Sequence, residues 1–306
     1  MGLTNFPHGI TSFGIPQLGG GGLVPVTSGS YFWVDSNASS GGDGTYEFPY
    51  NALSTAYAAC TTSKGDVIIM KPGHAETISA ATGIVFAKIG VTVVGLGNGS
   101  NRPTFTLTGT AATCTMNVTG ASNTFRNFIV TNGVDELTSA WTIGAAYCTL
   151  DGVDLLETSA SYQMKCGLTT VAAGDNLTVK NCRFLQITVA TGNGAAITLV
   201  GADDAVIVNN SISWLGTDHA ASGGIIGLTT ASLRVFIVGN YISTQGGTSC
   251  LGIGMYSGTT GVLAYNGVSC TNGAGSIVGA TAMATIQNFS GTTGTTSAIL
   301  DPAAGV

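Results

Sequence analysis

The clearest pattern along the chain is a short unit of alternating apolar positions that recurs every 23 to 32 residues. Each unit reads apolar residue, spacer, Asn or Gly, small or apolar residue, spacer, apolar residue. The units begin at Val93, Phe125, Leu150, Val179, Ile207, Ile237, Leu263 and Ile286. The alternation has the period of two expected of a β-strand, but it slips by one residue across the Asn or Gly. We therefore expect each unit to be two short strands joined at a corner.

Strands that repeat at this period predict a stack of coils. A single coil cannot bury its own inner face, so successive coils must pack on one another. The predicted fold is all-β: a single-stranded right-handed parallel β-helix of about eight or nine coils, its handedness following from the crossover preference of parallel strands. A β-sandwich is the alternative, but its strands usually recur every 8–12 residues or so with tight hairpin turns.

The Asn and Gly positions form the predicted structural corners of the coils, because these residues tolerate a left-handed backbone. We expect the asparagines among them to stack as an amide ladder. The predicted corner residues are Asn127, Gly152, Asn181, Asn209, Gly239 and Asn288.

One helix is expected near the amino terminus, over residues 51–60. Leu53, Ala56, Tyr57 and Cys60 fall on one face at helical spacing. Since both ends of a β-helix need cover, this helix is predicted to cap the first coil.

Composition narrows the possible functions. Charged residues make up 8% of the chain, which is too few to cover the solvent-exposed faces of a helical bundle. Hydrophobic residues make up 44%, which is too many for a disordered chain. The net charge of −6, without a basic cluster, argues against nucleic-acid binding. No apolar stretch predicts a membrane span or a secretory signal. The seven cysteines have no paired spacing, so we expect reduced core thiols in a protein folded in the cytosol, and neither a metal nor a cofactor.

The acidic residues offer three weak candidates for chemistry. Asp203-Asp204, with His219 and Arg234 downstream, faintly echoes a glycosidase pair, but a solvated loop is the simpler interpretation. The second group could hold a cation, although a solvated acidic face is expected; it comprises Asp151, Asp154 and Glu157. His74, beside Glu76, is expected at a turn of the first coil. We expect no enzymatic activity.

The first 34 residues contain no Asp, Glu, Lys or Arg, and Pro and Gly interrupt their apolar positions. Pro and Gly forbid a stable helix, and an apolar strap of this kind needs a surface to lie on. We expect it to bind another subunit or a larger assembly, with packing along its own β-helix as the alternative. The candidate partner-binding residues are Leu3, Phe6, Ile10, Phe13, Ile15 and Leu18.

Several segments in a fixed order carry a resemblance to pectin-lyase-like β-helix proteins, a group that includes polysaccharide lyases, phage tailspikes and other virion proteins. These segments are Tyr31–Asp35, Gly41–Thr45, Phe48–Leu53, Lys64–Ile68 and Pro72–Glu76. The resemblance indicates the fold but gives almost no information about activity.

The segment Leu3–Pro16 resembles the start of tailed-phage structural proteins found among head-assembly genes. That resemblance implies a head decoration protein on the capsid surface, assembled in the host cytoplasm, with the major capsid protein or another virion protein as partner. It also implies a homotrimer. The alternatives are a glycan-binding tailspike or fibre, with Trp141, Trp214 and Tyr241 as sugar-stacking candidates, and a polysaccharide hydrolase or lyase.

The expected organisation has four parts. An anchoring arm spans residues 1–30, followed by a first strand, loop and capping helix over 31–62. The β-helix covers 63–290, and a tail covers 291–306.

Overall fold

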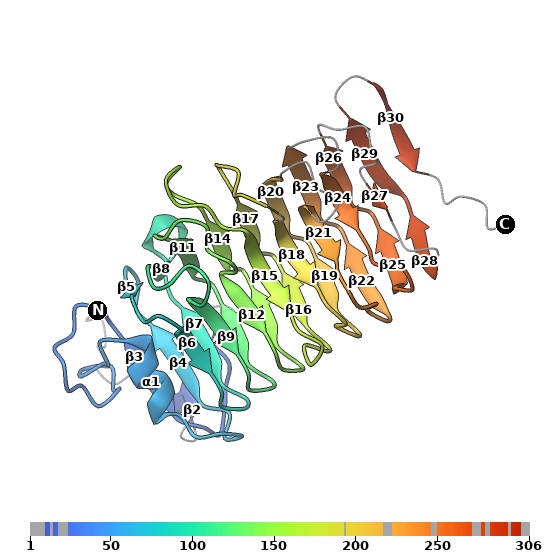
Figure 1. The fold of residues 1–306 in the computed structure, drawn as a ribbon. Helices are drawn as coiled ribbons and strands as arrows, with labels where there is room; N and C mark the ends of the chain where they lie inside the picture. The colour runs from blue at the N-terminus through green and yellow to red at the C-terminus, as the bar shows by residue number, and fades with distance from the viewer. Residues whose placement is uncertain are drawn as a thin grey trace, which may run out of the picture.

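The computed structural model describes residues 24–192, 194–216, 222–245, 250–270, 277–278, 282–292 and 295–300, together with two short strands at 10–12 and 15–17. Within this part the chain is a β-solenoid whose coils stack along one axis (Figure 1). Apart from the antiparallel pairs β1–β2 and β29–β30, every strand pairing is parallel. The predicted parallel β-helix is therefore confirmed, and the β-sandwich alternative is wrong.

Each coil contributes one strand to each of three sheets. Sheet 1 contains β3 (Tyr31–Val34), β4 (Val67–Met70), β7 (Thr92–Gly95), β10 (Thr124–Arg126), β13 (Thr149–Asp151), β16 (Thr178–Lys180), β19 (Val206–Val208), β22 (Val235–Val238), β25 (Thr260–Ala264) and β28 (Ala282–Ile286). Sheet 2 contains β5 (Ala75–Ile78), β8 (Thr104–Leu107), β11 (Ile129–Asn132), β14 (Asp154–Leu156), β17 (Arg183–Leu185), β20 (Ser211–Leu215), β23 (Tyr241–Gln245), β26 (Gly267–Cys270), β29 (Asn288–Thr292) and β30 (Thr295–Leu300). Sheet 3 contains β6 (Gly83–Phe86), β9 (Thr115–Val118), β12 (Trp141–Ile143), β15 (Cys166–Thr170), β18 (Ala195–Leu199), β21 (Gly223–Gly227), β24 (Leu251–Gly254) and β27 (Ile277–Val278).

The eight strands of sheet 3 mean that the chain makes seven full turns between β6 and β27. Strands before β6 and after β27 add partial turns at either end. Counted as full turns, the stack is slightly shorter than the predicted eight or nine coils.

The connections between sheets differ sharply in length. In six consecutive coils, from β10 to β26, only two residues separate the strand of sheet 1 from that of sheet 2. The connections from sheet 2 to sheet 3 are instead loops of four to nine residues. We call the side of the solenoid formed by these loops the loop edge. From β10 onward the constant corner sets the shape of the coil, and the connections that follow sheets 2 and 3 carry the variation in repeat length.

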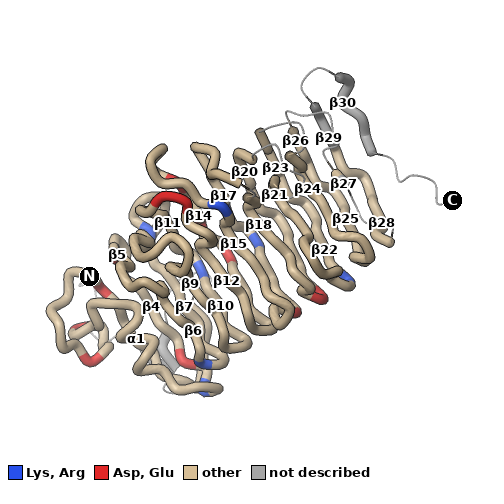
Figure 2. The backbone as a smooth tube through the Cα atoms, viewed as in Figure 1, with Lys and Arg blue, Asp and Glu red and all other residues tan. Residues whose placement is uncertain are grey.

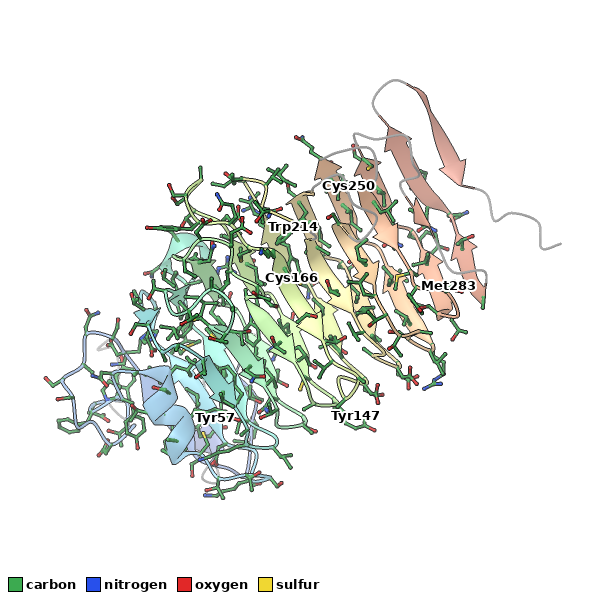
Figure 3. All side chains as sticks on the ribbon, viewed as in Figure 1. Tyr57, Tyr147, Cys166, Trp214, Cys250 and Met283 are labelled. Carbon is green, nitrogen blue, oxygen red and sulfur yellow. The ribbon has the colours of Figure 1, made fainter. Side chains whose placement is uncertain are left out.

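The interior is one continuous apolar core that runs from Val34 to Met283. Aromatic rings fill its amino-terminal half: the Phe125 ring lies 4.9 Å from Phe86 and 4.8 Å from Trp141, centroid to centroid, in edge-to-face contacts. In Figure 3 the labelled Trp214 lies among the coils, whereas Tyr147 points away from them. Because successive coils share this core, the rod is stiff along its axis.

The predicted helix is present as α1 (Leu53–Ala59), beside the first strands of the stack (Figure 1). Its buried residues join the core. The Leu53 backbone N–H donates to Glu76 Oε2 at 2.8 Å, and the Tyr57 hydroxyl accepts from the Lys88 backbone N–H at 2.7 Å. A 3-10 turn, η1 (Gly99–Asn101), is the other helical segment described. That α1 serves as a lid for the first coil stays a prediction.

The outer side of sheet 1 is apolar at its amino-terminal end, and there it is covered. Val67, Ile69 and Val94 point outward, yet each is at most 1% exposed. Val24 and Trp33 are among the residues that pack against them. The last part of the predicted arm, from Val24 onward, thus packs on its own solenoid, as the alternative had it; the Thr27 hydroxyl there donates to Gly65 O at 2.6 Å.

Most of the predicted arm lies outside the described residues, including Leu3, Phe6, Phe13 and Leu18. Ile10 and Ile15 belong to β1 (Ile10–Ser12) and β2 (Ile15–Gln17), which pair antiparallel. The binding role of the arm and the four-part division of the chain stay predictions.

Candidate functional site

The aspartate pair that suggested a glycosidase is held in an ion pair. Arg234 Nε lies 2.6 Å from Asp204 Oδ1, and Arg234 Nη2 lies 2.6 Å from Asp204 Oδ2. The residues are 30 positions apart, one coil, so stacking brings them together. Hydrogen bonding to Arg234 holds the pKa of Asp204 below its usual value. Asp203 accepts a hydrogen bond from the Leu233 backbone N–H, while His219 lies outside the described residues.

Asp151 and Asp154 occupy the outer side of the corner between sheets 1 and 2, where cations balance them. Asp151 lies 3.0 Å from Arg126 and 3.6 Å from Lys180, and the side chains of Asp154 and Arg102 form a second ion pair. Burial disfavours ionisation of Asp151, but hydrogen bonds from Asn181 and Arg126 and the nearby positive charges hold its pKa below its usual value. Together with Arg102, Arg126 and Lys180, the two carboxylates form a strip of alternating charge along this corner.

Glu157, the third member of that predicted acidic group, lies elsewhere, inside the loop edge. Its carboxylate is 3% exposed and accepts backbone N–H groups from Met164, Ile187 and Thr188. Burial raises the pKa of Glu157 against these hydrogen bonds. The side chain therefore joins two loops, and the structure does not bring it together with Asp151 and Asp154.

The carboxylate of Glu136 ties further loops at the loop edge. It accepts from the Thr191 backbone N–H at 2.8 Å and lies 3.2 Å from Lys165 Nζ. In Figure 2 charged positions lie at the upper edge near β11 and β14 and also along the lower edge of the solenoid, near β6 and β22.

His74 follows the turn after β4, as expected, and is 1% exposed. Its Nε2 lies 3.3 Å from Glu76 Oε2, the same oxygen that accepts the Leu53 N–H. This pair links the first coil to α1. It faces the core, where the His74 ring packs at 5.5 Å from Phe105.

Two of the three aromatic residues considered for sugar stacking are core residues. Trp141 and Trp214 are 0% exposed, so neither ring offers a face to a ligand. Tyr241 differs, with 63% of its side chain exposed on the outer side of sheet 2.

The predicted corner positions adopt the left-handed backbone in five of six cases. Their φ angles lie between 55° and 67°, for Asn127, Gly152, Asn181, Asn209 and Gly239. In the last coils the equivalent positions are held by Tyr265 and Gln287, which also have positive φ. Asn288 lies one residue beyond this row, because Ile286 pairs with Ala264 and the assigned register was shifted by one. Ile286, the first apolar position of the last predicted unit, is 41% exposed.

The amide ladder is formed by the residue after the corner. Asn210, Asn240, Asn266 and Asn288 are each at most 2% exposed and lie in successive coils. Each of the first three donates its backbone N–H and its Nδ2 to Oδ1 of the next, over 2.9–3.0 Å. Each Nδ2 of the last three also donates to a strand carbonyl of the preceding coil, at 2.8–2.9 Å. Of the predicted ladder members, only Asn288 belongs to it.

A different feature marks the last coils: their outer surface has no charged side chain. No Asp, Glu, Lys, Arg or His occurs anywhere in residues 235–300. In Figure 2 the coloured charges accordingly stop before β25. We define the uncharged face as the outward residues of sheets 1 and 2, and of the corner between them, from β19 and β20 onward. Its most exposed members include Phe236, Tyr241, Tyr265, Ile286 and Phe289, at 41–63%.

Sequence analysis missed the uncharged face, although a signal was present. The 66-residue run without charge is readable directly. Which of its apolar residues point outward could not be read, because consecutive apolar residues such as Val235–Val238 fit either register.

The described residues contain no group of three or more His, Cys, Asp or Glu side chains that could hold a metal ion. In the same part of the chain, no helix has the length and apolar character to cross a membrane.

The fold places the chain among three-sheet parallel β-helix proteins. No protein-family model and no curated protein matches it. Among solved structures, it is similar to a rhamnogalacturonan lyase, with 13% identity over 79% of this chain and 74% of that one, at a TM-score of 0.48. Pectate lyase Pel9A gives 16% identity over 86% and 80%, at a TM-score of 0.44. A GH136 lacto-N-biosidase from Eubacterium ramulus gives 9% over 81% and 65%, at a TM-score of 0.43. At these identities the similarity is one of fold alone and gives no information about activity.

Proposed function

We propose that this protein is a structural subunit of a bacteriophage particle, a decoration protein on the outside of the head. In this proposal the arm, residues 1–30, binds the major capsid protein or another virion protein, and the β-helix projects as a stiff rod. The amino-terminal resemblance to head-assembly proteins motivates the proposal.

The ion pairing of the candidate catalytic carboxylates favours a structural role over glycoside cleavage. Asp204 is matched by Arg234, Asp154 by Arg102, and Asp151 by Arg126 and Lys180. General acid–base cleavage of a glycoside needs one carboxyl able to give a proton and a second facing the same bond. Low pKa values at Asp151 and Asp204 make both poor proton donors near neutral pH.

A rod with one continuous core suits a particle exterior. Buried apolar area and closely packed coils stabilise it, and six of its seven free cysteines are buried. The arm, lacking Asp, Glu, Lys and Arg, can lie in an apolar groove without burying an unpaired charge.

The test is attachment to purified particles. Deleting residues 1–26 is expected to abolish attachment while the far-ultraviolet β-signal of the protein is retained. Phe6→Asp should weaken attachment, and Phe48→Asp serves as the matched control, since Phe48 is 67% exposed outside the arm. Copy numbers tied to capsid symmetry are expected on the particle.

Two results would reject the proposal. Particles decorated equally by the truncated protein would remove the role of the arm. A glycan-cleaving activity of the purified protein that Asp203→Asn eliminates would replace the structural role with an enzymatic one.

A further inference from the structure

The uncharged face has the properties of an interface. Soluble surfaces carry about a quarter to a third charged residues, and the cores of protein–protein interfaces are depleted in charge and enriched in aromatic residues. On this face Phe236, Tyr265 and Phe289 are 43%, 55% and 56% exposed, with no charged side chain among the described residues of β22 to β29.

The rows of this face come from strict register. Along sheet 1 the outward row reads Thr124, Thr149, Thr178, then Val206 and Phe236 in successive coils. The same row changes from threonine to apolar residues at β19. The neighbouring row changes similarly, from Asp151 and Lys180 to Val208 and Val238. Both rows therefore become apolar in the same coil.

At the amino-terminal end of sheet 1, the outward apolar residues are covered by other parts of the chain. There Val67, Ile69 and Val94 are at most 1% exposed because the chain itself covers them. At β22 and β28 the outward Phe236 and Ile286 keep 43% and 41% exposure. One end of the sheet is covered within the chain, and the other is open.

The dimensions fit association. Four coils about 4.8 Å apart, and two strands of about five residues each at about 3.3 Å per residue, give two surfaces that meet at the corner and together measure roughly 600 Å². A stable interface buries about 800 Å² per partner, so this face supplies about three quarters of that area and its rim has to supply the rest.

We infer that this face binds a second copy of the same chain. Fourteen of the fifteen acidic residues and all nine basic residues lie between Asp35 and Arg234. With fourteen acidic and nine basic residues, that region has a net charge of −5, so two copies that met through it would bring net like charge together. The uncharged face is where identical surfaces meet without repulsion and without burying an unpaired charge. A strongly charged partner would find no counter-charge there. This inference is independent of the proposed attachment through the arm.

The test is the mass of the purified full-length chain in solution, measured by light scattering. The wild type is expected at a multiple of 30.6 kDa. Phe236→Glu, which places a charge on the sheet 1 part of the face, should weaken association at least about 100-fold and give 30.6 kDa. Tyr241→Glu, at a 63% exposed position, should act in the same direction.

The matched control is Thr178→Glu, in the same outward row two coils before Phe236. It should leave the mass of the oligomer unchanged. Circular dichroism and urea midpoints establish that the variants are folded.

A monomeric wild type at high concentration would overturn the inference, as would an unchanged mass of both folded glutamate variants. Deletion of residues 1–26 should leave the oligomer intact while abolishing particle attachment. If that deletion alone produced the monomer, the arm and not this face would be the contact between copies.

Discussion

Asn240→Ala is the sharpest test of how the coils are held in register. Asn240 is 1% exposed, and its side chain makes five hydrogen bonds of 2.9–3.3 Å: from the Asn210 N–H and Nδ2, and to Ile207 O, Val238 O and Asn266 Oδ1. Alanine removes all five bonds and leaves two buried donors of Asn210 without this acceptor. At about 1–3 kcal/mol for each unsatisfied buried group, we expect the free energy of unfolding to fall by about 4 kcal/mol.

Urea unfolding followed by far-ultraviolet circular dichroism measures this loss. The control is Asn209→Gly at the adjacent position. Asn209 is solvent-exposed with φ of 55°, a conformation that glycine adopts freely, so its substitution should change stability by less than about 0.5 kcal/mol. A loss below about 1 kcal/mol for Asn240→Ala, or equal losses for the two variants, would refute the ladder as a stabilising element.

Three further predictions concern the charged and nucleophilic groups. Asp204→Asn should leave the urea midpoint unchanged, because its ion pair with Arg234 is exposed; a large shift would contradict this. Because burial raises the pKa of Glu157, the native state holds this proton more tightly than the unfolded chain. Its contribution is therefore fully present below the unfolded-state pKa of about 4.3 and declines as pH rises through the raised pKa. Glu157→Gln should flatten stability against pH over that interval, and an unchanged profile would argue against it. Burial raises the pKa of Cys60 to about 12 and that of Cys250 to about 11, so neither thiol should react with iodoacetamide at pH 8 while the chain is folded. Mass spectrometry should find both cysteines labelled only after urea unfolds the chain. Rapid labelling of the native protein would show that these thiols are accessible.

The fold was predictable because the repeat shows both where the strands lie and where the chain turns between them. The slip of alternation at Asn127 and Asn181 marked corners that do have left-handed backbone. The ladder was misplaced by one residue because tandem asparagines such as Asn209-Asn210 do not reveal which one turns the chain. Only the stacked register shows that the second faces inward.

The candidate site was less predictable, for a physical reason. One coil separates Asp204 from Arg234, so their proximity follows from the repeat length. The pairing of Arg102 with Asp154, 52 residues apart, spans two coils and depends on the path of the loop after β7. The apolar outer rows were hidden because Val206 and Val208 look like core residues in sequence.

The contrast between the two-residue corner and the variable loop edge makes this solenoid a natural display scaffold. A foreign peptide inserted between Ala160 and Ser161 would extend a loop that already has nine residues and would leave the stacked strands untouched. Each doubling of loop length costs only about 0.6 kcal/mol of closure entropy. Peptides grafted into neighbouring loops would be held in a line about 4.8 Å apart, the spacing of adjacent strands.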